Sequence, residues 1–130
     1  MVILDTSFLY AYFNDQDAHH LKALSIAKEL HGQALYFPSS VFFELLNLFS
    51  MRKNIETAMQ VGKNLLAPDS AATLLKMDDS FLDETWGTFQ KNAPSHLSLT
   101  DSSVLYVALE YGSDLITFDQ ALKASYERLK

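Results

Sequence analysis

The feature of this sequence that most constrains its fold is a series of short apolar runs that alternate with longer segments of helical periodicity. Three runs are clear, at residues 2–4, 34–37 and 115–118, and a fourth segment at 71–77 could form another strand. Runs this short and this apolar are typical of strands buried on both faces. Strands that alternate with helices pair in parallel. We therefore expect an α/β fold with three layers, α/β/α, around a central, mostly parallel sheet.

The segments between these runs carry apolar residues at helical spacing and end at turn residues. The first helix should follow a cap at Thr6 or Ser7, and the second should follow the turn at residues 14–17 and end near residue 30. Further helices are expected over residues 39–52, 55–66, 78–90, 100–112 and from 119 onward. The chain has no repeat or linker and the usual length of one domain, so we expect residues 1–130 to form a single domain.

Composition excludes several classes of protein. There is no Cys, which rules out a disulfide framework and a thiolate zinc site. The start, Met-Val-Ile-Leu-Asp, lacks the basic and long apolar regions of a signal peptide, and no stretch is long enough to span a membrane. We therefore expect a soluble, cytoplasmic protein. The net charge of −6 argues against a broad phosphate-binding surface and fits a chain that binds cations or a basic partner.

Four carboxylates are expected to meet at one edge of the sheet. Asp5 directly follows the first predicted strand and Asp119 directly follows the last. Because parallel strands end at the same edge, both carboxylates should emerge there, where ligands of such folds bind. Asp101 shares a helix face with the apolar residues three, four and seven positions later. Glu44 lies beside the apolar stripe of its own helix, about one turn from the helix start.

Each acid also has a structural explanation. Asp101 and Asp119 could cap helices, and Asp5 could satisfy the backbone of a turn. Glu44 is harder to explain in this way, because a partly buried carboxylate needs a partner and no Lys or Arg is placed to pair with all four acids. Clustered carboxylates raise one another's pKa, so a fold tolerates them when a cation neutralises them. Mg²⁺ and Mn²⁺ prefer such oxygen ligands, and the pattern predicts a divalent-metal site.

Four segments, taken in order, resemble the PIN-domain family. They are Val-Ile-Leu-Asp-Thr-Ser at the start, Val-Phe-Phe-Glu-Leu-Leu around Glu44, Leu-Thr-Asp-Ser-Ser around Asp101 and Leu-Ile-Thr-Phe-Asp ending at Asp119. The resemblance extends over nearly all 130 residues. It implies a parallel sheet between helices and an Mg²⁺- or Mn²⁺-dependent ribonuclease, in which an activated water hydrolyses RNA phosphodiester bonds.

The resemblance also implies residue roles and partners. Asp5, Asp101 and Asp119 would ligate or steer the metal, and Glu44 would complete the set directly or through water. Three small polar residues would hold the acids by hydrogen bonds: Thr6, Ser7 and Thr117. Small prokaryotic members of the family are mostly VapC-like toxins of toxin–antitoxin pairs, which implies a homodimer and an antitoxin that blocks the site.

An RNA-cleaving protein also needs cations near its site. Arg52 and Lys53 are candidates for RNA contact, because they lie two helical turns beyond Glu44. Cations at a helix C-terminus are equally well explained by the helix dipole.

Two other functions are open on the sequence alone. One is a phosphatase or receiver domain with an aspartyl nucleophile, which would fit the position of Asp5 after a strand. The phosphatase pattern needs a second Asp where this chain has Ser7. A receiver needs an Asp after a mid-chain strand and a Lys at the end of a late strand, and this chain shows neither. A non-catalytic interaction module on the same fold is the second alternative. It would have no reason to bear the repulsion of four acids.

The histidines and the aromatic residues near Asp5 have simpler interpretations. His19, His20, His31 and His96 are dispersed, which favours exposed or helix-end roles over a zinc site. The aromatic residues of segment 8–13 could border a substrate groove or a dimer face, but core packing is favoured.

Overall fold

The sheet follows the apolar runs of the sequence. The structure, a computed structural model, describes all residues from 1 to 130. Its strands are β1 (Val2–Leu4), β2 (Leu35–Pro38), β3 (Ala72–Leu75) and β4 (Asp114–Ile116). They form one sheet in the order β3-β2-β1-β4, and every neighbouring pair is parallel. All three residues of β1 are buried because the strand lies between two neighbours and is covered on both faces. The expected α/β class is confirmed.

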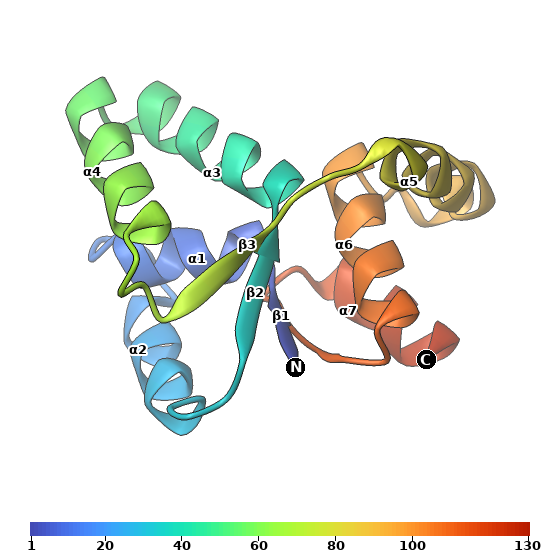
Figure 1. The fold of residues 1–130 in the computed structure, drawn as a ribbon, viewed down its shortest axis with the longest axis horizontal. Coiled ribbons are helices and arrows are strands. Elements are labelled where there is room, and N and C mark those ends of the chain that lie inside the picture. Colours follow the sequence, from blue (N-terminus) through green and yellow to red (C-terminus); the bar gives the residue numbers. More distant parts are fainter.

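Helices form the two outer layers. They are α1 (Thr6–Phe13), α2 (His20–Glu29), α3 (Ser39–Arg52), α4 (Ile55–Leu66), α5 (Asp79–Lys91), α6 (Leu99–Glu110) and α7 (Gln120–Leu129), with a short 3₁₀ turn, η1 (Ala93–Ser95). Helices α1 to α4 lie on one side of the sheet, and α5 to α7 lie on the other (Figure 1). None of them has both the length and the apolar character that crossing a membrane requires.

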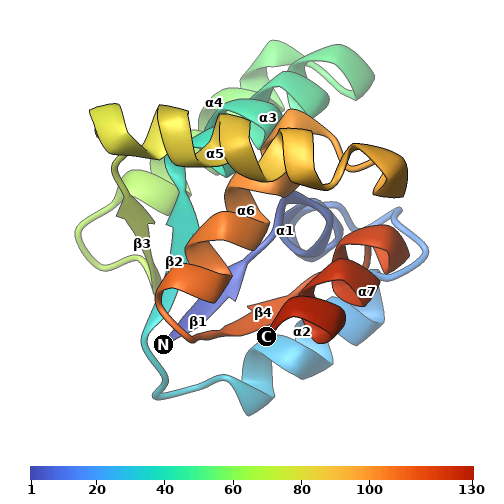
Figure 2. The same ribbon diagram turned by 90° about the vertical axis from the view of Figure 1, so that its right-hand side faces the viewer.

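The strand order reverses beside β1. The chain moves outward from β1 through β2 to β3, and then returns to place β4 on the other side of β1 (Figure 2). In the register, Leu4 at the end of β1 pairs with Ile116 at the end of β4. The residues that follow these two strands therefore start at the same level of the same edge. Open α/β sheets bind ligands in the crevice at such a reversal point.

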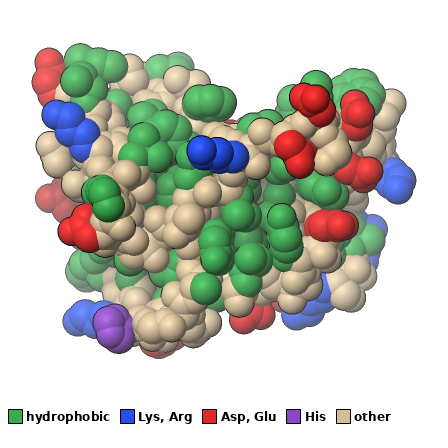
Figure 3. Space-filling view, in the orientation of Figure 1, with side chains coloured by type: hydrophobic (Ala, Val, Ile, Leu, Met, Phe, Trp, Pro, Cys, Tyr) green, Lys and Arg blue, Asp and Glu red, His purple; other side chains and the backbone are tan.

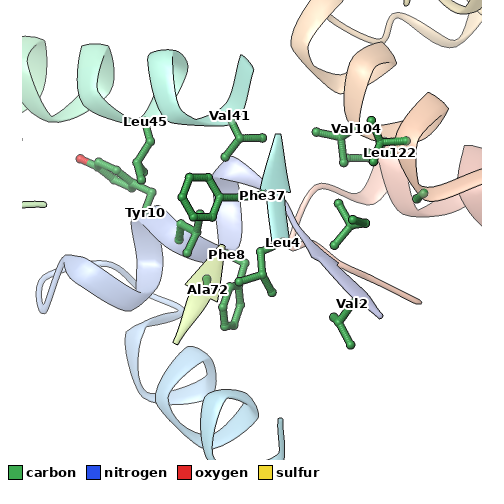
Figure 4. Close-up of a cluster of buried hydrophobic side chains, with 14 of the residues drawn as sticks. Val2, Leu4, Phe8, Tyr10, Phe37, Val41, Leu45, Ala72, Val104 and Leu122 are labelled. Atoms are coloured by element: carbon green, nitrogen blue, oxygen red, sulfur yellow. The ribbon is translucent and has the colours of Figure 1, made fainter. Parts of the chain in front are cut away.

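The core is divided by the sheet. On the side of α1 and α3, Phe37 packs near Val41 and Leu45, while Val104 and Leu122 lie on the opposite side (Figure 4). These five side chains are completely buried. Burial of each such side chain favours folding by about 1.5–3 kcal/mol, so the apolar faces of α3, α6 and α7 hold both helical layers on the sheet.

Most element bounds agree within two residues, and three differences need explanation. The last strand ends at Ile116 rather than residue 118, because the Phe118 N–H donates to the Ser7 hydroxyl instead of continuing the ladder. Two residues, Thr117 and Phe118, therefore separate the end of the strand from Asp119. The first helix has Asp5 at its N-cap position, and Thr6 is already helical. The third strand covers Ala72–Leu75, within the broader segment expected.

Candidate metal centre

Asp5 is the most buried of the four acids, with 2% of its surface exposed. Its Oδ2 accepts hydrogen bonds from the hydroxyls of Ser7, at 2.8 Å, and Thr117, at 2.7 Å. Its Oδ1 is buried without any hydrogen-bond partner. Burial raises the pKa of this carboxyl group, and the bonds from Thr117 and Ser7 oppose that shift only in part.

The segment Thr117–Asp119 is joined to Asp5 by a small network. The Phe118 N–H donates to the Ser7 hydroxyl at 2.9 Å, and the Asp119 N–H donates to the Thr117 hydroxyl at 3.0 Å. Asp119 is half-buried and caps α7, since its Oδ1 accepts the Leu122 N–H. Ser7 and Thr117 thus connect Asp5, which follows β1, with the segment that carries Asp119 after β4.

Asp101 approaches the same edge from α6. It forms a capping box with Ser98, in which the Asp101 N–H donates to the Ser98 hydroxyl and the Ser98 N–H donates to Asp101 Oδ2. The group is half-buried. Burial raises its pKa, and the nearby negative charges of Asp5 and Asp119 raise it further. The three aspartates therefore interact electrostatically, although the first and the last are 114 positions apart in the sequence.

Glu44 enters from α3. It is half-buried and lies between the fully buried Val41 and Leu45, which place it at the border of the apolar face, as the sequence predicted. The start of α3 is attached to α6 by a hydrogen bond between the hydroxyls of Ser40 and Ser103, at 2.6 Å. This contact holds the helix of Glu44 against the helix of Asp101.

All four acids line one open hollow of about 310 Å³. Its other lining residues are Thr6, Ser7, Tyr10, Asp17, His19, Leu48, Arg52 and Phe118. The only ion pair in the structure joins Lys130 and Glu127, so no acid of the hollow is neutralised by a Lys or Arg within 4.0 Å. The geometry thus brings together the residues that the sequence placed at one sheet edge.

The donor set suits a hard divalent cation, although the side chains are not arranged around a common point. Carboxylate oxygens are the preferred ligands of Mg²⁺ and Mn²⁺, and Asp5 Oδ1 has no other partner. No three acidic or histidine side chains of the structure surround a position for a metal ion. Asp101 and Asp119 each give one oxygen to the N-terminus of a helix. Each retains a second carboxylate oxygen, so the capping and ligand roles are compatible.

Of the predicted supporting residues, Thr6 does not take the expected part, and of the two candidates for RNA contact only Arg52 lines the hollow. Thr6 lines the hollow, but its hydroxyl is buried without a partner, so it does not hold an acid. Lys53 is not among the lining residues and donates to Gln16 at 2.7 Å, whereas Arg52 does line the hollow. The two cations differ because Arg52 is the last residue of α3, whereas Lys53 follows the helix with a non-helical backbone.

The sequence did not identify Asp17 and His19 as site residues. Both lie between α1 and α2. For Asp17 the sequence predicted only a place in a turn. For Tyr10 core packing was favoured over a place beside a substrate groove; the residue is buried and also lines the hollow. No periodicity marks residues of a loop, so only the path of the chain could place His19 beside the acids.

Solved structures with the same fold include three from bacteria. VapC20 of Mycobacterium tuberculosis, described as a toxin that cleaves the sarcin-ricin loop, superposes with a TM-score of 0.86 at 17% identity, covering 96% of this chain and 95% of that one. FitAcB of Neisseria gonorrhoeae superposes with a TM-score of 0.72 at 14% identity, covering 98% of this chain and 94% of that one. VapBC2 of Rickettsia felis, bound to a DNA fragment from its promoter, superposes with a TM-score of 0.68 at 14% identity, covering 99% of this chain and 93% of that one.

At the level of sequence, no curated protein matches the chain significantly. The family model described as PIN domain matches residues 2–127, which is almost the entire sequence. The expected resemblance is therefore confirmed, and the chain belongs to the PIN-domain family.

Proposed function

We propose that this protein is an Mg²⁺- or Mn²⁺-dependent endoribonuclease whose active site is the four-carboxylate hollow. The observation that carries this proposal is the environment of Asp5. A carboxylate with 2% exposure keeps one oxygen without a hydrogen-bond partner, and it lines a hollow that holds four more acids, Asp17 among them, and no paired cation. Burying such a group is costly unless a cation compensates for it. Membership of the PIN-domain family supports the same reading.

The residues of the hollow have distinct roles in this proposal. Asp5, Asp101 and Asp119 would hold the metal, and Glu44 would complete the set from α3, directly or through water. A bound divalent metal would lower the pKa of a water molecule and stabilise charge on a phosphate. Ser7 and Thr117 act by position, since their hydroxyls fix the rotamer of Asp5.

The toxin assignment rests on the structural neighbours. One neighbour is described as a toxin and another as a toxin–antitoxin complex from Klebsiella pneumoniae. We extend this to the present chain: it is the toxin of a toxin–antitoxin pair, and its antitoxin covers the acidic hollow.

Exposed apolar side chains supply surfaces for such partners. The outer parts of α3 and α4 expose Phe43, Met51, Ile55 and Met59, each by more than half. Helix α5 exposes Leu82 by 63% and Trp86 by 53%, within a surface where acidic side chains gather (Figure 3). Contiguous apolar surface marks interaction sites, and we assign these faces to the antitoxin and to a homodimer contact.

Cleavage of RNA by the purified chain tests the main proposal. With Mn²⁺ or Mg²⁺, the wild type should cut a single-stranded RNA, EDTA should stop the reaction, and Asp5→Asn and Asp101→Asn should each abolish it. Asp69→Asn, at an exposed turn outside the hollow, is the matched control and should cut normally. Circular dichroism of each variant shows whether the fold is retained.

Two results would contradict the proposal. Normal cleavage by both folded Asn variants would remove the acids from the mechanism. Absence of Mn²⁺ and Mg²⁺ binding in calorimetry, together with absence of cleavage, would instead favour the non-catalytic interaction module. For the partner assignment, a monomer in light scattering and harmless induction in a bacterial host would argue against the homodimer and the toxin.

A further inference from the structure

A stacked pair of aromatic rings stands at the rim of the acidic hollow. The rings of His19 and Phe118 lie 4.7 Å apart with an interplanar angle of 17°, and both residues line the hollow. Phe118 rests in turn on Phe8 of the core, at 6.0 Å, and Phe8 is 3% exposed. His19 remains exposed at the end of this column. The core therefore supports a flat ring that one side of the site presents to solvent.

The loop that carries His19 is fixed by hydrogen bonds. The His19 N–H donates to Asp17 Oδ1 at 2.8 Å, and the Gln16 N–H donates to Asn14 Oδ1 at 3.2 Å. Lys53 of the α3 C-terminus donates to the Gln16 side chain at 2.7 Å. The position of His19 is thus set by the fold on both sides of the loop.

The stacked pair is also joined directly to the proposed catalytic acids. Phe118 immediately precedes Asp119, and the Phe118 N–H donates to the Ser7 hydroxyl that holds Asp5. Any group stacked on His19 would therefore lie beside the acids and in a fixed relation to them.

A free cation completes the rim from α3. Arg52 lies on the same face as Glu44 and Leu48, at intervals of four residues, which places it about 12 Å along the helix from Glu44. Its guanidinium lies 5.5 Å above the ring of Tyr10, which is itself buried. Arg52 makes no ion pair, so its N–H groups are available for an anion in an otherwise acidic hollow.

We propose that His19 and Arg52 form a nucleotide subsite for RNA next to the four acids. The His19 ring, supported by Phe118, stacks on an unpaired base, and the Arg52 guanidinium, supported by Tyr10, binds a backbone phosphate. Aromatic rings and free arginines are the groups by which proteins hold single-stranded RNA. This inference rests on the proposed ribonuclease function and specifies its substrate: RNA with an unstacked base beside the cleaved bond.

Base stacking requires a base that has left the duplex, so the subsite discriminates by RNA structure. In a continuous duplex both faces of each base are covered by neighbours, and the deep groove of A-form RNA does not admit side chains. We therefore expect loops and single strands to use the subsite and paired RNA not to use it.

Binding in EDTA tests the subsite without cleavage. Fluorescence anisotropy of a labelled single-stranded RNA should show His19→Ala weakening the affinity by about 5- to 50-fold. His19→Phe should stay within about twofold of the wild type, because stacking needs only an aromatic face. The matched control is His31→Ala, an exposed histidine outside this hollow. A 2-aminopurine base in the same RNA reports stacking directly, through quenching that His19→Ala should remove.

The salt dependence of binding tests Arg52. Arg52→Gln should reduce the slope of log affinity against log salt by about 0.7, the value for one phosphate contact on a single strand. Lys63→Gln, on α4 and outside the hollow, should leave the slope unchanged. Equal affinity of His19→Ala and the wild type, equal weakness of His19→Phe and His19→Ala, or an unchanged slope in Arg52→Gln would each overturn the proposal.

Cleavage kinetics separate this proposal from the function on which it rests. In Mn²⁺, His19→Ala should raise KM by about the factor by which it weakens RNA binding, while kcat changes less. It should not change the cleavage of fully paired RNA. If the wild type cuts RNA and His19→Ala changes neither KM nor Kd, the subsite is wrong and the ribonuclease function stands. If the wild type does not cut RNA but His19→Ala weakens binding, the RNA subsite stands and the ribonuclease function is wrong.

Discussion

Replacing Asp5 by asparagine should stabilise the metal-free protein while removing its activity. The substitution keeps the shape of the side chain and leaves one oxygen to accept the hydrogen bonds from Ser7 and Thr117. It removes a negative charge from a side chain that is 2% exposed and whose other oxygen is unpartnered. The metal-free fold therefore loses an unfavourable feature without losing a hydrogen bond.

The size of the effect follows from the environment of that oxygen. A buried polar group without a partner costs about 1–3 kcal/mol, and a charged one costs more. The new amide N–H group would also lack a partner, so the net gain is the difference between the charged and the neutral case, about 1–2 kcal/mol. For a chain of this length, such a gain raises the melting temperature by about 3–10 °C.

The dependence of stability on pH independently gives the sign of the effect of Asp5→Asn. The pKa of Asp5 is raised above its ordinary value of 3.8 in the folded protein, so the folded state binds more protons than the unfolded state between the two pKa values. Its favourable contribution is therefore complete below about pH 3.8 and is lost as the pH rises through the raised pKa. The advantage of Asp5→Asn should grow across that window. Asp101, whose pKa is also raised, contributes a slope of the same sign to the dependence of stability on pH.

Differential scanning calorimetry against pH, with and without Mn²⁺, measures all of these effects. The wild type should gain about 2.7 kcal/mol when free Mn²⁺ is a hundred times the dissociation constant, and Asp5→Asn should gain much less. Asp69→Asn, an exposed control, should stay within about 0.5 kcal/mol of the wild type. A metal-free Asp5→Asn variant that melts below the wild type at neutral pH would refute the argument about the buried charge.

Three further predictions follow from single contacts. Thr117→Val should destabilise the protein by about 1–3 kcal/mol in urea unfolding and raise the pKa of Asp5 further, because the carboxylate loses a hydrogen-bond donor, while Thr117→Ser should retain both properties. Ser98→Ala should cost about 1 kcal/mol in thermal unfolding by removing the cap of α6 at Asp101, and no change would mean that the capping box contributes little. Leu45→Ala, at a fully buried position, should cost about 2–5 kcal/mol in the same urea assay, and a cost below about 1 kcal/mol would show that α3 is not held by this core.

Much of the fold could be predicted because its signals are local. Short apolar runs specify strands covered on both faces, and helical spacing specifies the faces of α3 and α6. Parallel pairing then brings Asp5 and Asp119 to one edge without any further information. The exception at residues 117 and 118 is informative, because their apolar and β-branched character favours a strand. The hydrogen bonds from Thr117 to Asp5 and from Phe118 to Ser7 take these residues out of the sheet.

The remaining features of the site depend on contacts between distant segments. Arg52 and Lys53 are adjacent cations, yet Arg52 ends α3 and lies over Tyr10 of α1, while Lys53, beyond the end of the helix, reaches Gln16. His19 comes to Phe118, ninety-nine positions away, because hydrogen bonds at both ends of its loop set the path of the chain.

The sequence by itself therefore determined the order and kind of the elements and the meeting of the acids, since side-chain periodicity and parallel pairing are rules that act along the chain. Only the tertiary structure decided which carboxylate oxygens are free, since this depends on the hydroxyl or N–H group that each one meets. Asp101 and Asp119 each give one oxygen to a helix N-terminus, whereas Asp5 keeps one buried oxygen that accepts no hydrogen bond.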